Sequence, residues 1–362
     1  MNPSSSADRA PEMPYALERR GVIMTSDPHD PQEAEGVLNP GTAWGPDGEL
    51  YLYPRIVAEG NVSRIARARV IVKDGVPVDV EREGVVLEPD AAWERGHQNA
   101  GVEDPRITFL EPLGLHVMTY VAYGPLGPKS AVAISRDTVT WERLGPLHFA
   151  YQPDLDTDLN LFANKDIVFF PEAVPGPDGR PSLALLHRPM WDLGWLREGE
   201  GAHVPAGIDD DRPSIWIGYI DLDAALEDPR TLTTVRDSAM LVAPEAWYES
   251  AKIGAGPSPY RVPEGWLLLH HGVSGAVPRG FELAHGSQYS AGAIVLDAED
   301  PRRVVARSAD PLLFPESGPE VEGTLANVVF PTAIERIDGR DFVFYGMADS
   351  SIGVAELLRD QT

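Results

Sequence analysis

The chain has 362 residues, of which 30 are basic and 56 are acidic, so its formal net charge is −26. A surface with so much negative charge repels phosphate backbones and anionic lipids, which argues against nucleic acid or a membrane surface as a partner. Cysteine is absent, and this excludes disulfides, thiolate metal sites and a cysteine nucleophile. The 34 glycines and 34 prolines exceed average usage and are typical of a turn-rich architecture.

The first residues differ in composition from the rest of the chain. Residues 1–35 are rich in Pro, Ser, Asp and Glu, and no apolar run of signal-peptide length follows a basic start. We interpret residues 1–35 as an N-terminal leader, either a disordered tail or an arm that packs on a neighbouring subunit. Residues 36–362 then form one folded domain. No apolar run is long enough to span a membrane, so we expect a cytoplasmic protein.

Short apolar runs separated by turn residues dominate residues 36–362. Five of them resemble one another and recur at intervals of 65, 66, 84 and 75 residues: LYLYPRI from Tyr51, HVMTYVAY from His116, SLALLHRP from Ser182, WLLLHHGV from Trp266 and DFVFYGMA from Asp341. A second run with small central residues follows each one: SRIARARV from Ser63, SAVAISRD from Ser130, SIWIGYID from Ser214, YSAGAIVLD from Tyr289 and SSIGVAEL from Ser350. The pattern predicts five repeats built from strands.

A strand repeat of this length is typical of a β-propeller, in which each blade is an antiparallel sheet of four strands. We therefore predict an all-β fold with five blades. A β-sandwich followed by a second all-β domain is the alternative. The small residues of the second runs suit crowded innermost strands near the axis. Polar clusters at the ends of the first runs would then converge on one axial funnel, where a site is expected.

The densest cluster of chemical groups is GVEDPRIT, residues 101–108, in which Glu103 and Asp104 precede a proline. Proline favours an extended or turn geometry before it, and adjacent residues on an extended chain point to opposite faces. We therefore expect only one of the two carboxylates to enter a pocket. Arg106 would share a face with Asp104 and lower its pKa, or else bind an anion. A salt-bridged loop is the structural alternative to a catalytic site.

Cationic residues stand at the ends of further strands. Lys165 in NKDIVFFPE is either a solvated charge at a strand start or part of an anion site. His187 and Arg188 close the third apolar run and form a candidate phosphate clamp. His270 and His271 take the equivalent place in the fourth repeat. Adjacent histidines on a strand diverge and no metal-binding spacing supports them, so we predict no metal site.

Three further motifs are less specific. The Gly/Pro segment KIGAGPSPY, residues 252–260, would let backbone amides approach a ligand, but it follows no strand–helix phosphate-loop pattern. Asn327 and Asp349 lie at the edges of apolar strands, where a turn cap is the ordinary explanation. The sequence has no GxSxG elbow and no Rossmann glycine fingerprint, which argues against serine esterase and dehydrogenase chemistry.

The order of these motifs matches that of one enzyme family. NPG at Asn39, SRI at Ser63, GVEDPRIT, NKDIVFFPE, HRP, KIGAGPSP, GWLLLHHGV, NVVFPTA and YGMADSSIGVAEL make residues 36–358 resemble glycoside hydrolase family 130, the β-mannoside phosphorylases and related β-mannosidases. The resemblance implies a five-bladed β-propeller and inverting cleavage of a β-mannosidic bond. In phosphorylase members, inorganic phosphate is the co-substrate and α-mannose 1-phosphate the product. No cofactor is implied.

The resemblance also implies roles for individual residues. The general acid is the Asp of the EDPR motif, here Asp104, which in the family acts through a hydroxyl of the bound mannose. The residues implied in sugar binding are Asn39, Arg55, Arg64, Glu103 and Asp349. The residues implied in phosphate binding are Lys165, His187, Arg188, His271 and Tyr289, with Lys129 as a further candidate. Glu249 and Ser258 depart from the usual family pattern, which affects the acceptor sugar more than the reaction.

The leading hypothesis is phosphorolysis of short β-mannosides, with a β-1,2 linkage as the first candidate. An enzyme that uses water would have no need of a cluster of Lys165, His187 and Arg188. A β-mannosidase of the same family is the alternative, with Glu172 or Glu249 as the base. A non-catalytic sugar-binding or interaction propeller is disfavoured because the acid is present. Members of the family often form homo-oligomers, and the leader is a candidate for that contact.

Overall fold

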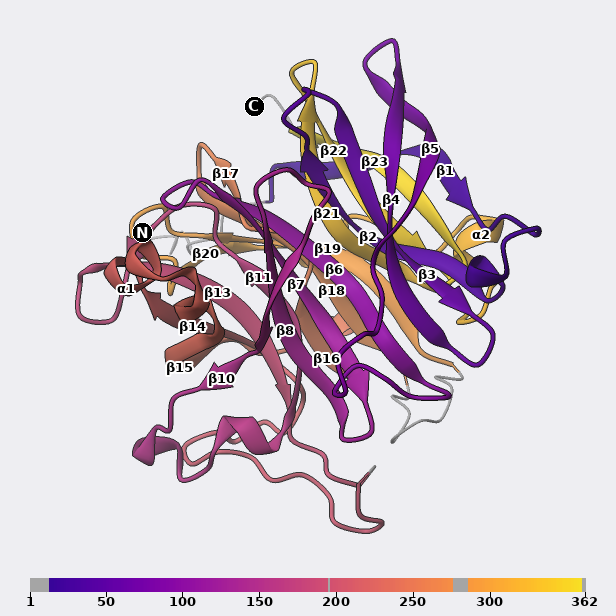
Figure 1. The fold of residues 1–362 in the computed structure, drawn as a ribbon. Helices are drawn as coiled ribbons and strands as arrows, with labels where there is room; N and C mark the ends of the chain where they lie inside the picture. Colours follow the sequence, from indigo (N-terminus) through magenta and orange to yellow (C-terminus); the bar gives the residue numbers. More distant parts are fainter. Residues whose placement is uncertain (1–12, 195, 276–285, 360–362) are drawn as a thin grey trace, which may run out of the picture.

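The computed structural model describes residues 13–194, 196–275 and 286–359, and strands dominate this part of the chain (Figure 1). The described helices are short: α1 (Leu222–Glu227), α2 (Gly318–Val321) and the 3-10 turns η1 (Pro31–Glu33), η2 (Pro153–Leu155), η3 (Leu159–Leu161), η4 (Pro229–Thr233) and η5 (Trp247–Glu249). None of the helices in the described ranges has the length and apolar character needed to cross a membrane.

The strands form the five blades of a β-propeller, and in the first four blades the four main strands are antiparallel and follow chain order from the inside outward. The first blade holds β2 (Gly36–Trp44), β3 (Leu50–Ala58), β4 (Val62–Lys73) and β5 (Val76–Leu87). The second holds β6 (Ala100–Leu110), β7 (Leu115–Gly124), β8 (Gly127–Ser135) and β9 (Glu142–Pro146). The third holds β11 (Ala163–Phe169), β13 (Pro181–Met190), β14 (Ile215–Asp221) and β15 (Thr234–Val242), with the short β10 (His148–Phe149) and β12 (Val174–Pro175) also paired to it. The fourth holds β16 (Lys252–Ala255), β18 (Gly265–Ser274), β19 (Gln288–Leu296) and β20 (Val304–Arg307), with β17 (Tyr260–Val262) paired to β18, and the fifth holds β21 (Val329–Ile337), β22 (Arg340–Met347) and β23 (Ser351–Arg359).

The predicted five-bladed β-propeller is confirmed, and the two series of apolar runs are the second and third strands of the blades. The expected place of the small residues is wrong, because the innermost strands are β2, β6, β11, β16 and β21. The small residues of the third strands make room for aromatic rings instead. A Cβ atom on Gly292 would lie 2.1 Å from the Tyr248 hydroxyl, and one on Gly353 would lie 2.6 Å from the Tyr345 ring.

An apolar core lies between each pair of neighbouring blades. Between the fifth blade and the first, Phe342 and Phe344 of β22 pack in one cluster with Leu50 and Leu52 of β3. Equivalent clusters join the first blade to the second, the second to the third, the third to the fourth and the fourth to the fifth. Because a blade buries both of its faces, its strands appear in the sequence as continuous apolar runs rather than alternating ones.

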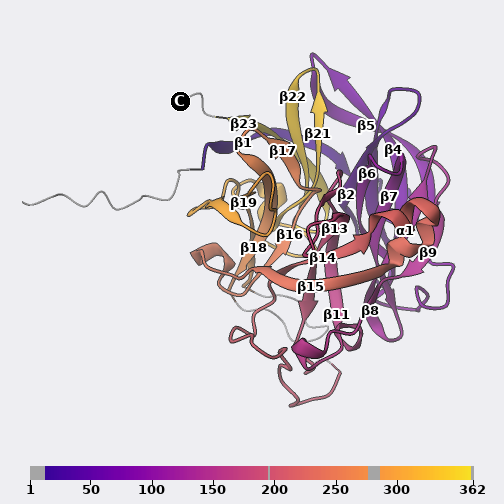
Figure 2. The same cartoon turned by 90° about the vertical axis from the view of Figure 1, so that its left-hand side faces the viewer.

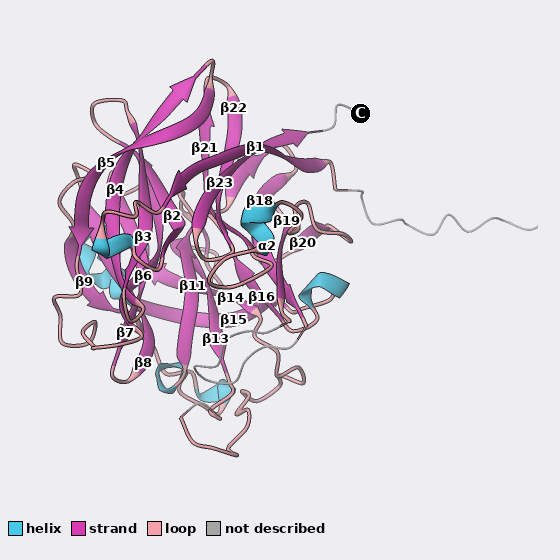
Figure 3. Ribbon diagram, turned by 90° about the vertical axis from the view of Figure 1, so that its right-hand side faces the viewer, coloured by secondary structure: helices cyan, strands magenta, loops and turns pink. Residues whose placement is uncertain are grey.

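The fifth blade takes its fourth strand from the other end of the chain. Residues Tyr15–Thr25 form β1, which pairs antiparallel with β23 (Figures 2 and 3). The structure therefore differs from the expected leader over residues 1–35: residues 1–12 lie outside the described residues, and β1 belongs to the propeller. The strand is polar because it lies at a sheet edge, where charged side chains are favoured, and this composition suggested a leader. Arg19 Nε of β1 contacts Glu320 Oε1 at 2.8 Å.

Candidate active site

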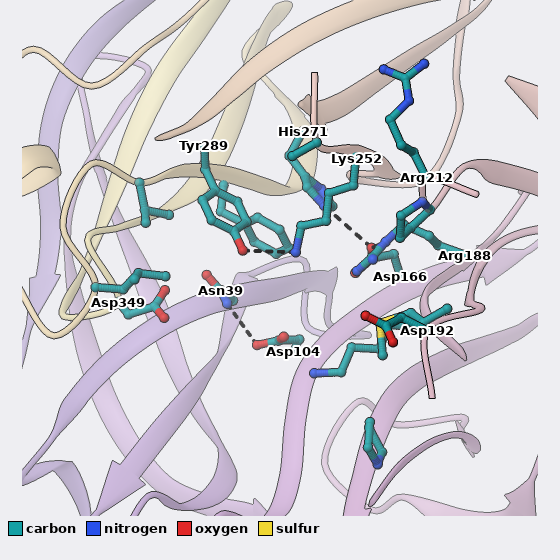
Figure 4. A pocket seen from close by; sticks show the side chains of 18 of the residues that line it. Asn39, Asp104, Asp166, Arg188, Asp192, Arg212, Lys252, His271, Tyr289 and Asp349 are labelled. Atoms are coloured by element: carbon teal, nitrogen blue, oxygen red, sulfur yellow. Dashed lines mark hydrogen bonds and ion pairs between the residues drawn. The ribbon is translucent and has the colours of Figure 1, made fainter. Parts of the chain in front are cut away.

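A pocket of about 660 Å³ lies where the five innermost strands meet, and this volume is in the range of small-molecule sites. The innermost strands supply Asn39, Asp104, Lys165, Lys252 and Phe330, one from each blade. Eight of the predicted site residues line the pocket, several of which are shown in Figure 4: Asn39, Arg55, Asp104, Lys165, Arg188, His271, Tyr289 and Asp349. The predicted axial funnel is therefore present.

Four innermost strands shift register near the pocket: β21 does so between Pro331 and Ala333, and the other three have a β-bulge that contains an Asn or Asp. The pairing of β2 with β3, of β6 with β7 and of β11 with β13 shifts register there. In each bulge an Asn or Asp adopts the left-handed conformation, with φ of 42° at Asn39, 47° at Asp104 and 57° at Asp166. Asn and Asp enter this region more readily than other residues with a Cβ atom. A bulge redirects the side chain that it carries, and here all three side chains line the pocket.

The second bulge decides how the adjacent carboxylates of Glu103 and Asp104 point. Arg55 Nη2 donates a hydrogen bond to Glu103 Oε1 at 3.0 Å, and Arg55 Nη1 donates one to Asp104 Oδ1 at 3.2 Å. Both carboxylates therefore contact one guanidinium group, whereas an extended chain would have separated them. Asp104 lines the pocket, whereas Glu103 is buried beside it, with 3% of its surface exposed. As predicted, only one of the two carboxylates enters the pocket. The predicted reason is wrong, because the two side chains do not point to opposite faces.

The charge of Asp104 is set by its neighbours. Asn39 Nδ2 donates a hydrogen bond of 2.8 Å to Asp104 Oδ1. Burial raises the pKa of Asp104, but Arg55, Lys165 and the Asn39 hydrogen bond outweigh burial and hold the pKa below its ordinary value. Asp349, in the turn between β22 and β23, differs: burial and the charge of Asp104 raise its pKa to about 6, against the opposing effect of Arg55.

Basic side chains surround Asp166 on another side of the pocket (Figure 4). Arg188 Nε donates a hydrogen bond to Asp166 Oδ2, Arg106 Nη2 lies 3.6 Å from Oδ1 and His271 Nε2 lies 3.5 Å from Oδ2. Burial raises the pKa of Asp166, but the charges of Arg188 and Arg106 lower it far more. Burial lowers the pKa of His271 well below its usual value, so its ring is neutral. Nη1 of Arg188 is buried without a hydrogen-bond partner among the described residues, and can donate to an anion.

Lys252 brings a further cation to the same side. Its Nζ donates a hydrogen bond of 3.1 Å to the Tyr289 hydroxyl (Figure 4). Burial lowers the pKa of Lys252 to about 7, and the positive charges of Arg188 and Lys165 add to this effect. A lysine in this state is close to losing its proton at neutral pH, and a bound anion would stabilise its charged form. The geometry around Lys252, Arg188 and His271 is therefore that of an anion site.

Besides Glu103, two predicted site residues do not line the pocket. Arg64 lies on β4 with its Nε 4.0 Å from Glu88 Oε2. His187 is fully buried against aromatic rings, and burial lowers its pKa to about 3. Neighbours on a strand point to opposite faces, so Arg188 enters the pocket and His187 points into the core between blades. The structure thus supports the arginine of the predicted phosphate clamp and not its histidine.

The remaining candidates also have structural roles. Lys129 donates hydrogen bonds to the backbone carbonyls of Asn160 at 3.2 Å and Phe162 at 3.1 Å. Glu172 pairs with Arg261 at 3.2 Å on the surface. Neither of these side chains lines the pocket.

Glu249 is fully buried away from the pocket. Its carboxylate lies 2.8 Å from His270 Nε2, contacts Arg307 and accepts hydrogen bonds from the amides of Glu245 at 2.9 Å and Ala246 at 3.0 Å. Burial raises the pKa of Glu249, but the His270 hydrogen bond and the other partners lower it to about 2. Both carboxylates expected as the base of a hydrolase therefore lie outside the site.

Sequence reasoning missed several lining residues. Asp166 lies in the motif NKDIVFFPE and Lys252 in KIGAGPSPY. Their orientation depends on bulges and on strand order, which a single motif does not encode. Asp192, Asp211 and Arg212 come from the long connection between β13 and β14. The long interval between the third and fourth repeats in the sequence indicates an insertion and could have predicted this connection. Arg212 is anchored there by Asp210, with 2.6 Å between Nη2 and Oδ2.

Comparison with known proteins places the chain among enzymes of mannoside metabolism. A family model described as β-1,4-mannooligosaccharide phosphorylase matches residues 8–200 and 225–361. A 1,2-β-oligomannan phosphorylase of Thermoanaerobacter sp. (strain X514) is 31% identical over 260 residues, 71% of this chain and 68% of that protein. A β-1,2-mannobiose phosphorylase of the same organism is 28% identical over 276 residues, 75% of this chain and 70% of that protein. A β-1,4-mannooligosaccharide phosphorylase of Ruminococcus albus is 28% identical over 288 residues, 78% of this chain and 70% of that protein.

Solved structures share the fold. The β-1,2-mannobiose phosphorylase of Listeria innocua, in complex with β-1,2-mannobiose, superimposes with a TM-score of 0.68 at 21% identity and covers 96% of this chain and 97% of that one. A glycosyl hydrolase from Bacteroides ovatus gives a TM-score of 0.68 at 21% identity and covers 94% and 93%. The family model matches strands of all five blades and leaves out residues 201–224, which include β14. The chain belongs to glycoside hydrolase family 130.

Proposed function

We propose that this protein is an inverting phosphorylase that cleaves short β-mannosides with inorganic phosphate and releases α-mannose 1-phosphate. The observation that carries the proposal is the anion site beside Asp104, where Arg188, Lys252 and the neutral ring of His271 line one pocket. The three relatives named above are all mannoside phosphorylases. Two of their names specify a β-1,2 linkage, so β-1,2-linked manno-oligosaccharides are the first proposed substrates.

The proposed reaction is a single displacement. A phosphate oxygen forms a bond to the anomeric carbon of mannose while the bond from that carbon to the glycosidic oxygen breaks. Attack on the face opposite the leaving group inverts the configuration. The glycosidic oxygen receives a proton that Asp104 supplies through a hydroxyl of the bound mannose, and the acceptor sugar leaves as an alcohol. Phosphate is already an anion, so this reaction needs no second carboxylate to act as base.

The acid must be protonated when the bond breaks, whereas Arg55 and Lys165 favour the ionised form of Asp104. Phosphate adds negative charge beside these cations, and a nearby like charge raises the pKa of a carboxyl group. We therefore infer that phosphate binding loads the acid as well as supplying the nucleophile. Asn39 and Asp349 lie beside Asp104 in the pocket and are the proposed partners of the mannose hydroxyls (Figure 4).

A β-mannosidase that uses water is the second candidate, and one observation favours it. Asp349 has a pKa of about 6, which is in the range of a general base for water at neutral pH. Asp166 is a poorer base, because Arg188 and Arg106 hold its pKa far below the ordinary value. The cationic side of the pocket has no evident use in such a reaction.

The test is the cleavage of β-1,2- and β-1,4-mannobiose with and without inorganic phosphate, followed by phosphorus and proton NMR. Phosphorolysis predicts cleavage that depends on phosphate and yields the α anomer of mannose 1-phosphate. The β anomer would contradict inversion. Free mannose released at the same rate without phosphate would make the protein a hydrolase and direct attention to Asp349.

A further inference from the structure

Glu103 contacts two cations that flank the proposed acid, although it does not itself line the pocket. Its Oε1 accepts a hydrogen bond from Arg55 Nη2 at 3.0 Å, and its Oε2 lies 3.7 Å from Lys165 Nζ. Each carboxylate oxygen therefore serves a different cation. Arg55 belongs to the first blade, Glu103 to the second and Lys165 to the third, so one buried side chain connects three blades at the axis.

The two cations differ in how firmly other groups hold them. Arg55 also donates hydrogen bonds to Ser63 Oγ at 2.8 Å and to Asn61 Oδ1 at 3.2 Å, so several contacts fix its place. Lys165 has a flexible side chain whose ammonium group lies 5.7 Å from the Tyr123 ring centre in addition to its contact with Glu103. Glu103 therefore contributes more to the position of Lys165 than to that of Arg55.

We propose that Glu103 is a positioning residue that holds Arg55 and Lys165 in register beside Asp104. This inference rests on the proposed function of the pocket. Because Glu103 does not line the pocket, its effect on the reaction passes through the cations that do. The charged groups facing Asp104 from the packed elements are Arg55 on β3, Glu103 and Arg106 on β6, Lys165 on β11 and Asp349 in the turn after β22.

The decisive variant is Glu103→Asp, which keeps the charge and shortens the side chain by one methylene group. The shorter carboxylate cannot reach both cations from the same backbone position. We expect phosphate binding, measured by calorimetry, to weaken about 5-fold, which is the loss of one ordinary hydrogen bond. We expect kcat for mannobiose cleavage to fall about 10-fold or more, because small misplacements at an active site are costly.

Glu94→Asp is the matched control. Glu94 is equally buried, bonds to Tyr120 at 2.8 Å and to Arg143 at 3.0 Å in the second blade, and does not line the pocket. The control is expected to lose stability without a change in phosphate affinity or kcat per folded molecule. If Glu94→Asp reproduces the losses, or if Glu103→Asp binds phosphate and turns over within twofold of wild type, the positioning role is wrong.

Glu103→Gln adds a readout that lost stability alone does not change. Removal of an anion beside Asp104 stabilises the ionised acid, so the high-pH limb of the kcat profile moves to lower pH. Glu103→Asp leaves this limb in place. Cleavage is followed as released reducing sugar, which measures hydrolysis and phosphorolysis alike. If the wild-type protein releases free mannose, the proposed phosphorylase activity is refuted, but the effect of Glu103 on cleavage can still be measured. The calorimetric comparison of phosphate binding needs no turnover.

Discussion

Asn39 and Asp104 occupy bulges on neighbouring innermost strands, and the Asn39 amide donates a hydrogen bond of 2.8 Å to the Asp104 carboxylate. Both residues have a left-handed backbone and both precede a proline, which restricts the conformation of the residue before it. Such conformations persist only where the surrounding structure enforces them. The position of the proposed acid is therefore set by the backbone of two blades rather than by the substrate.

Asp104→Asn is expected to abolish turnover and leave the fold intact. The amide oxygen still accepts from Asn39, but the side chain has no proton to give, and loss of a general acid costs about 10²- to 10⁴-fold in rate. The measurement is kcat on β-mannobiose together with the melting temperature. Activity near that of wild type in a normally folded variant would show that another group supplies the proton.

Lys252→Met is expected to raise KM for phosphate about 10- to 100-fold, the value of a hydrogen bond to a charged group. KM for the mannoside should change much less. Lys73→Met, at the exposed end of β4, is the control and should change neither constant. An equal increase of both KM values for Lys252→Met would indicate a distorted pocket rather than a lost phosphate contact.

Phosphate binding is expected to be linked to proton uptake by Lys252. Its pKa of about 7 means that much of the population is neutral at pH 8, whereas an adjacent anion favours the charged form. Wild type should therefore take up more protons than Lys252→Met when phosphate binds at pH 8, and affinity should fall as the pH rises through 7. Calorimetry in buffers of different ionisation enthalpy measures this uptake. Equal uptake by the two proteins would contradict the assignment.

His271→Phe and His187→Phe form a matched pair, because each keeps a ring and removes its nitrogens. His271 lines the pocket and His187 does not. The first substitution should raise KM for phosphate about 2- to 10-fold, as expected for a neutral hydrogen bond. The second should lower the melting temperature without changing KM. If KM for phosphate rose in His187→Phe and not in His271→Phe, His187 would be the phosphate ligand, and its burial between the blades would be contradicted.

Glu249→Gln should destabilise the protein by about 1–3 kcal/mol, because it breaks the buried pair with Arg307, which keeps its 3.3 Å contact with Glu245. The kcat per folded molecule should stay within twofold of wild type. The pKa of Glu249 is lowered to about 2 in the folded state, so its stabilisation is present above the unfolded pKa and is lost as the pH falls. The difference in melting temperature should shrink from about pH 5 toward pH 2. Loss of kcat with an unchanged melting temperature would instead identify Glu249 as a catalytic base.

The sequence allowed the second and third strands of each blade to be predicted, because strands buried on both faces are long apolar runs. The innermost strands were only partly predicted, with strands expected at Lys165 and beside Asn327, because several of them are short or interrupted. β16 has only 4 residues, and β2, β6 and β11 are broken by bulges that contain the polar residues of the site. β1 was missed because its edge position allows a polar composition.

The pocket was predicted residue by residue from the family motifs, and the errors follow from strand geometry. The motif predicted both His187 and Arg188 as phosphate ligands. Only the pairing register of β13 with its neighbouring strands decides which of the two faces the axis. Asp166 follows Lys165 directly and lines the same pocket because a bulge interrupts the alternation. Lys252 begins β16, a strand of 4 residues inside a Gly/Pro segment, and the sequence does not indicate a strand there. These orientations depend on contacts between blades, which no single motif contains.

The pairing of β1 with β23 has a consequence for biosynthesis. Tyr15 is opposite Arg359, so β1 finds its partner only after all the residues between them have been made. The fifth blade cannot be completed on the ribosome until β23 has emerged, and contacts between such distant residues form slowly. Until then β1 has no partner, and the outer edge of β22 is unpaired and can recruit a strand from another nascent chain.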